Sequence, residues 1–376
     1  MTTNHTNHKE RTFTSRYGLP EVEHPPLLAF ITDCQDDFAK TKVEIAKLSA
    51  FGKNWHLLDT IGIPSFATHV LGIQAAVIAG YLGDYSNEHE EAAFLIANSA
   101  PREKGEGLIG GEIFIAVLDN GVPVLVTNGP GALTPFANHI EQLWKIEVDQ
   151  IDWLPETQFR SFAWFSELAQ KFVYGDPALI KTYIEDISTY VIPHEGAFCW
   201  LDDSFGNVKL TLTENDLNEL GIEDGDQITL RIGDYAVVVD KRDKLFPLPE
   251  GAGTDHIGLY KGSDKDLDGN HYYELAIAHK SARAWIEDHA QIIDEQGNEI
   301  TSEDAARLPF FGGESVEVIG IVKAAERDRP ATESVASRPQ ANGASNGLRE
   351  RHVGHPSRAD VVLEGPLVTV GSLGQS

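Results

Sequence analysis

Cysteine and long apolar runs are both scarce in this sequence. Two cysteines, Cys34 and Cys199, are too few for a disulfide framework or for a zinc site with four thiolate ligands. No apolar run reaches the roughly 18 residues that a helix needs to cross a bilayer. The polar stretch 1–16 lacks the apolar core of a signal peptide. We therefore expect a cytoplasmic protein without a membrane-spanning segment.

Basic residues are also few. The chain has 30 lysines and arginines against 58 aspartates and glutamates, which gives a net charge of −28. Such an acidic protein repels the phosphates of nucleic acids and the headgroups of anionic membranes, so we expect neither as a partner. The hydrophobic content of 41% and the charged content of 23% are typical of a globular protein.

Composition divides the chain into three zones. The polar residues 1–24 and the segment 325–376, which is poor in hydrophobic residues, are expected to be disordered tails. The part between them is long enough for two domains. A change of pattern near Pro193 and Gly196 places their boundary, so we expect domains at 25–192 and 193–324.

The first of these domains alternates expected strands and helices. The apolar run 27–32 is typical of a strand that is buried on both faces of a parallel sheet. Further strands are expected at 63–68 and 93–97, a hairpin at 112–127 around Asp119-Asn120-Gly121, and helices at 36–48, at 73–82 and from Thr134 onward. This order predicts a layered, Rossmann-like α/β domain with a mostly parallel sheet.

The second domain is expected to be small and built of strands. Short strand-like segments at 197–201, 208–212, 227–232, 235–240 and 272–278 surround one short helix at 214–220. Thr213 is the expected N-cap of this helix and Gly221 the residue that ends it. Closely spaced short strands predict a barrel-like β domain, and the junction of the two domains is a common place for a ligand.

The stretch 200–207 carries the most specific chemistry. It places Asp202, Phe205 and Asn207 in one tight turn between two expected strands. A carboxylate can bind an ammonium group, a phenyl ring can stack on a heterocycle, and an amide can pair with the edge of a base. S-adenosylmethionine has this combination of groups. The alternative is a hairpin in which these polar residues serve only the turn.

The order of motifs resembles the S-adenosylmethionine hydroxide adenosyltransferase family, which is related to the fluorinase and chlorinase. The resemblance covers about residues 26–323. The matching segments, in chain order, are Thr32-Asp33, Thr68-His69, 94–102, 128–131, the Asp-x-x-Phe-Gly-Asn motif at 202–207, and 274–278. The last two segments are the most distinctive, and the consistent order of all the segments carries the resemblance.

The resemblance implies roles for several residues. Asp33 would bind the ribose diol, Asp202 the methionine ammonium group, and Ser263 the methionine carboxylate. Phe205 and Asn207 would contact adenine. Family members are trimers with the ligand between neighbouring subunits, so the resemblance implies a homotrimer. S-adenosylmethionine would be a substrate, and no further cofactor is implied.

The catalytic residues depart from the family pattern. Ser161 matches the serine that handles halide in the halogenating relatives, whereas Arg160 stands where the hydrolytic relatives have histidine. The loop that carries a family aspartate is here 98–102, and Arg102 is the candidate for the third catalytic member. An arginine cannot serve as a base, although it can hold an anion. The sequence leaves open hydrolysis to adenosine and methionine, use of a halide, and binding without catalysis.

A metal site is not expected. Asp264, Asp266, Asp268 and Gly269 copy the first half of a calcium-binding loop, but the twelfth position is Leu275 instead of glutamate. A polar hairpin tip explains these residues better.

Overall fold

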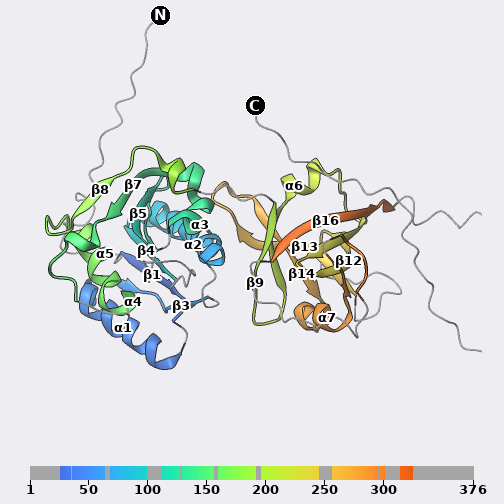
Figure 1. Cartoon of the computed structure of the whole chain (residues 1–376), viewed down its shortest axis with the longest axis horizontal. Helices are drawn as coiled ribbons and strands as arrows, with labels where there is room; N and C mark the ends of the chain where they lie inside the picture. The colour runs from blue at the N-terminus through green and yellow to red at the C-terminus, as the bar shows by residue number, and fades with distance from the viewer. Residues whose placement is uncertain are drawn as a thin grey trace, which may run out of the picture.

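The described part of the chain forms two sheets, each of eight strands and each accompanied by helices (Figure 1). This computed structural model describes residues 26–34, 36–63, 68–99, 112–127, 129–155, 160–191, 196–244, 256–294, 296–300 and 314–324. The expected α/β class is thereby confirmed in its general form. The expected tails 1–24 and 325–376 and the boundary residues 192–195 lie outside the described residues. No helix in the described part is both long and apolar enough to cross a membrane.

The first sheet is parallel in one half and antiparallel in the other. Its strand order is β2 (His56–Leu57), β1 (Leu27–Thr32), β4 (Ala93–Asn98), β6 (Pro123–Thr127), β5 (Ile113–Leu118), β7 (Ile140–Ile146) and β8 (Lys181–Tyr183), while β3 (Ile61–Gly62) also pairs with β1. Strands β1, β4 and β6 are parallel and buried, which explains their unbroken apolar runs. Their carboxyl ends therefore lie together at one edge.

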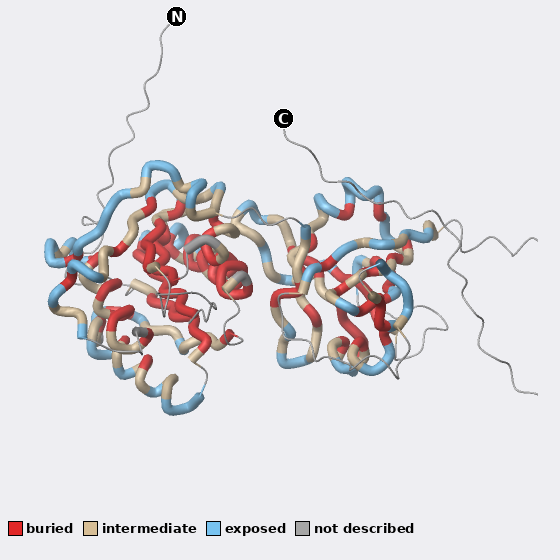
Figure 2. The backbone as a smooth tube through the Cα atoms, viewed as in Figure 1, coloured by how far each residue is buried: buried red, intermediate tan, exposed pale blue. Residues whose placement is uncertain are grey.

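Helices cover both faces of this sheet. Leu28 and Phe30 of β1 pack with α1 (Asp37–Phe51) and α5 (Phe165–Val173), which follows the short α4 (Arg160–Ala163). Ala29 and Ile31 point to the opposite face, where α2 (Thr68–His89), α3 (Gly129–Leu133) and the 3₁₀ helix Thr134–His139 pack. This alternation follows from the two-residue period of a strand. Figure 2 shows the resulting buried centre.

A buried lysine on α1 fixes the segment that precedes β3. The Lys47 side chain has no exposed surface, and its ammonium group lies 2.7 Å from the carbonyl oxygen of Leu58 and 3.1 Å from Thr60 Oγ1. Glu44 Oε1 is the third acceptor, at 2.8 Å. All three hydrogens of the ammonium group can therefore be donated, as a buried charge requires.

The second sheet closes on itself. Its order is β11 (Gln227–Ile232), β16 (Ser315–Val322), β9 (Ala197–Asp202), β10 (Val208–Thr213), β14 (His271–Ile277), β13 (Ile257–Lys265), β12 (Tyr235–Arg242) and β15 (Gln291–Ile292), and β11 also pairs with β12. Alternate residues such as Ile228, Leu230 and Ile232 form its core with α6 (Glu214–Glu219) and α7 (Ala282–His289). The predicted Thr213 cap is confirmed, because its side chain accepts a hydrogen bond from the Asp216 backbone.

Three local predictions were wrong. The strand expected at 63–68 is absent at both of its described ends, because Ile63 follows β3 and Thr68 begins α2, while residues 64–67 lie outside the described part. The helix expected from Thr134 ends after a 3₁₀ segment, and β7 follows, because pairing with β5 and β8 outweighs the helix-like spacing of Ile140 and Leu143. Helix α7 was not expected, since only one helix was predicted in this half.

The β13–β14 hairpin connects the two sheets. It extends towards α2 (Figure 1), where the Tyr81 hydroxyl donates to the Ser263 carbonyl oxygen at 3.4 Å. Leu267 packs against the core of the first sheet, and Asp268 lies 3.4 Å from His139. Ile73 and Val77 of α2 also form an apolar cluster with Trp200 and Tyr272.

Candidate functional site

Polar residues gather at the carboxyl ends of the parallel strands of the first sheet. Thr32 and Asn98 are paired at the ends of β1 and β4, and Asp33 follows directly with only 8% of its surface exposed. Thr127 ends β6 and both accepts from and donates to the backbone of Ser99. This edge is where open α/β sheets commonly bind their ligands.

Ser161 belongs to the same group. Its hydroxyl oxygen lies 2.6 Å from the Asn98 amide nitrogen, which donates to it, and 3.4 Å from the Cys34 sulfur. The same sulfur lies 4.0 Å from Asp33 Oδ1. The structure therefore brings the predicted residues Asp33 and Ser161 together. It adds Asn98 and Cys34, whose place at the ends of two apolar strands was the available signal.

The two arginines assigned to catalysis cannot be placed in this group. Arg102 lies outside the described residues. Arg160 begins α4, next to Ser161, but its side chain is not part of the described structure. Their catalytic roles stay predictions.

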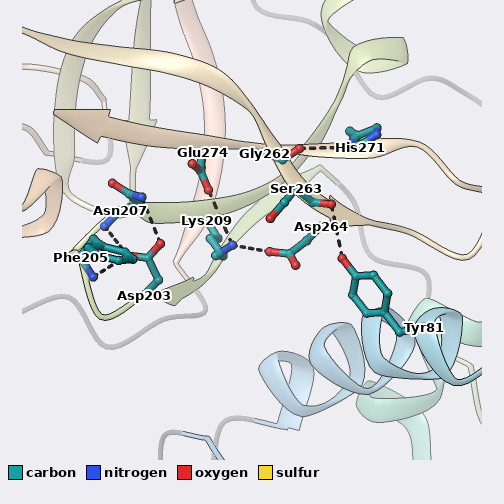
Figure 3. Close-up of polar contacts among 10 residues, drawn as sticks. All are labelled: Tyr81, Asp203, Phe205, Asn207, Lys209, Gly262, Ser263, Asp264, His271 and Glu274. Atoms are coloured by element: carbon teal, nitrogen blue, oxygen red, sulfur yellow. Dashed lines mark hydrogen bonds and ion pairs between the residues drawn. The ribbon is translucent and has the colours of Figure 1, made fainter. Parts of the chain in front are cut away.

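The turn between β9 and β10 is held by Asp203 (Figure 3). Its Oδ1 accepts from the backbone nitrogens of Phe205 at 2.9 Å and Asn207 at 3.0 Å, and its Oδ2 accepts from the Asn207 amide nitrogen at 3.1 Å. Gly206 has a positive φ of 77°, which favours glycine. Asp203 and Asn207 thus serve the turn, as the alternative interpretation predicts. Phe205 is held at its tip with 77% of its surface exposed.

Asp202 forms an ion pair with Arg283 of α7. Both of its carboxylate oxygens lie 3.0 Å from Arg283 Nη1, and Arg283 Nε donates to Glu287 at 3.1 Å. Burial lowers the pKa of Arg283, but hydrogen bonds to these two acids outweigh it, so the pKa lies above its ordinary value. Sequence reasoning missed Arg283, because it lies 81 residues from Asp202.

Lys209 lies between the turn and Ser263. It forms ion pairs with Asp264 and, at 3.6 Å, with Glu274 (Figure 3). Burial lowers the pKa of Lys209, yet the hydrogen bond and charge of Asp264 raise it above its ordinary value. Ser263 itself is exposed on β13.

Replacing Glu274 with glutamine is expected to stabilise the protein at neutral pH. Burial raises the pKa of Glu274; the Lys209 charge opposes this, while Asp203 and Asp264 add to it. A carboxyl with a raised pKa in the folded state destabilises that state at every pH above the raised pKa. Unfolding followed by circular dichroism at pH 8 should show a Tm about 2 °C higher for Glu274→Gln. The gain should disappear below about pH 4, where the wild-type carboxyl is protonated in both states. A gain that is independent of pH would contradict this explanation.

The predicted site residues therefore form two groups. Asp33 and Ser161 lie at the edge of the first sheet, whereas Asp202, Phe205 and Asn207 lie in one turn of the second. None of the hydrogen bonds given above joins one group to the other. Ser263 lies on a third element, beyond Lys209 as seen from the turn (Figure 3).

The acidic tip of the β13–β14 hairpin has structural contacts. Asp266 accepts from the backbone and side-chain nitrogens of Asn270, at 2.7 and 3.0 Å, and Lys265 pairs with His271. The predicted polar hairpin tip is thus confirmed. Within the described part of the chain, no three or more histidine, cysteine, aspartate or glutamate residues are grouped to hold a metal ion.

Comparisons with known proteins give structural similarity alone. No model of a known protein family matches the chain, and no curated protein matches it. The chain is similar to an uncharacterized conserved protein from Thermotoga maritima, with 13% identity and a TM-score of 0.49, over 77% of this chain and 99% of that one. It is also similar to a conserved hypothetical protein from Thermus thermophilus, with 14% identity and a TM-score of 0.41, over 79% of this chain and 100% of that one.

Proposed function

We propose that this protein binds S-adenosylmethionine and displaces methionine from the 5′ carbon of its ribose, with water as the default nucleophile. The proposal includes the finer architecture that the family resemblance implies, a Rossmann-like first domain followed by a barrel-like second domain. It also includes a homotrimer, in which the two groups of site residues from neighbouring subunits would face one ligand.

The observation that carries the proposal is the β9–β10 turn. An exposed phenyl ring is common on protein surfaces, but the backbone of Phe205 is held at the tip of a turn in which Asp203 accepts three hydrogen bonds. Asp202, the last residue of β9, lies three residues before Phe205. An exposed aromatic surface beside a charge suits a ligand with a heterocycle and an amino-acid group.

The first group suits the reacting end of such a ligand. The Asp33 carboxylate can accept from a ribose diol, and the Ser161 hydroxyl can contact a nucleophile. In hydrolysis, the water oxygen bonds to C5′ while the C5′–S bond breaks. The electron pair of the C5′–S bond passes to sulfur to give methionine, and one proton of the water passes to solvent. Because a sulfonium is already a good leaving group, catalysis requires mainly that the nucleophile is positioned in line with the C5′–S bond and loses its hydration shell.

The products of S-adenosylmethionine turnover test the proposal. Purified protein is incubated with this ligand, with and without chloride, and the products are separated by mass spectrometry. Adenosine and methionine are the expected products. A 5′-chloroadenosine would support halide use, the alternative favoured by Ser161 lying in the first group. Tight binding of unchanged ligand would support a protein that binds without catalysis, and failure to bind would exclude all three functions.

Asp202→Ala is expected to weaken S-adenosylmethionine binding about tenfold or more, because a charged partner of the ligand is lost. Ser161→Ala should change affinity less than about threefold, because Ser161 lies with the nucleophile and not with the amino-acid end. Isothermal titration calorimetry of both variants measures the difference. Equal affinities of Asp202→Ala and wild type would rule out the assigned ammonium contact.

A further inference from the structure

The ion pair between Asp202 and Arg283 limits what the turn can bind. Both oxygens of Asp202 already accept from the guanidinium group. A ligand with only a positive charge would have to displace Arg283 or lie beside it. Displacement would leave Arg283 with Glu287 alone, and binding beside it would make two cations share one carboxylate, which is unfavourable in partly buried surroundings.

We propose that Asp202 and Arg283 together form a receptor for the zwitterionic end of an α-amino acid. The ammonium group binds Asp202 and the carboxylate binds Arg283, so that the internal ion pair opens around a ligand that carries both charges. Every charge then keeps an opposite partner. The inference rests on the proposed function for the rest of the ligand, and it assigns the carboxylate to Arg283 in place of Ser263.

The position of Arg283 suits this role. Its backbone nitrogen donates to the Gly206 carbonyl oxygen at 3.0 Å, which attaches the start of α7 to the turn. Its Nε donates to Glu287 at 3.1 Å, while its Nη1 contacts both oxygens of Asp202. The planar fork of an arginine matches a carboxylate in geometry.

Both members of the pair are accessible. The side chain of Arg283 is 30% exposed and that of Asp202 is 40% exposed. The exposed ring of Phe205 belongs to the same turn, between Asp202 and the Gly206 carbonyl that Arg283 contacts. A ligand whose amino-acid end opens the pair can therefore place its remaining part near that ring.

Two ligands that differ only in the carboxylate test the receptor. Calorimetry on the full-length protein compares S-adenosylmethionine with its decarboxylated form, which keeps the sulfonium and the ammonium group. Wild type is expected to bind S-adenosylmethionine about tenfold to a hundredfold more tightly, as for a charge-assisted hydrogen-bonded pair. In Arg283→Gln the ratio should fall to less than about threefold, and Arg283→Lys should lie between the two.

The outcomes separate this inference from the proposed function. Equal binding of both ligands to wild type would overturn the receptor while the proposed function stands, and this comparison does not depend on any variant folding. Equal weakening of both ligands in Arg283→Gln would overturn it too, because it would show a merely structural role. Arg242→Gln, elsewhere on the second sheet, is the control and should keep the wild-type ratio. Failure of wild type to bind either ligand would overturn both ideas.

Discussion

Gly206→Ala is expected to destabilise the protein by about 3 kcal/mol, from backbone strain and loss of a helix cap. At a φ of 77° an alanine is strained, and its Cβ would overlap Ser281 Oγ and lie 2.9 Å from Ser281 Cα. Ser281 cannot move aside freely, because its side chain caps α7 by accepting from the Ala284 backbone at 3.1 Å. The substitution therefore disturbs both the turn and the helix that carries Arg283.

Gly221→Ala is the matched control for this prediction. Gly221 also has a positive φ, 66°, but an added Cβ would meet nothing within 4 Å. Its cost should be the strain alone, about 1 kcal/mol. Urea unfolding followed by circular dichroism measures both variants. Equal losses would mean that the contact with Ser281 has no energetic weight.

Lys47→Met is expected to destabilise the protein by about 3 kcal/mol, because it removes a buried ammonium group from the acceptors that surround it. Methionine fills a similar volume, so packing is largely kept. The Leu58 carbonyl and the Thr60 hydroxyl lose their donor, and both belong to the segment that leads into β3. Since β3 pairs with the last residues of β1, the change also loosens the backbone beside Asp33.

Lys261→Met makes the same substitution at an exposed strand position and should change stability by less than about 0.5 kcal/mol. Urea unfolding at pH 7 compares the two variants. If they lose equal stability, the buried hydrogen bonds of Lys47 are not what holds this segment.

The buried strands and the hairpins were predictable because their signals are local. The apolar run of β1 and the Asp119-Asn120-Gly121 turn each determine one element by themselves. Strand β7 was not predictable in this way, since it exists through pairing with β5 and β8. The short helix α6 lies between these cases, because Thr213 caps it locally.

The candidate site was predictable only within single segments. Asp202 and Phe205 stand in one motif, and Asp33 follows an apolar strand. The sequence does not show, however, which of two neighbouring acids has which role. In the structure Asp203 accepts the hydrogen bonds that hold the turn, whereas Asp202 pairs with Arg283. No pattern in the sequence links residues 202 and 283, or residues 98 and 161. Those contacts exist only after both chain segments have folded.

The hairpin of β13 and β14 has a consequence for how the molecule melts. Leu267, which the second half of the chain supplies, packs against the core of the first sheet, and α2 covers Trp200 and Tyr272 in return. Either half prepared alone would expose these apolar side chains to water and would tend to aggregate. The two halves should accordingly lose their structure together, in a single cooperative step, although each has a sheet of its own.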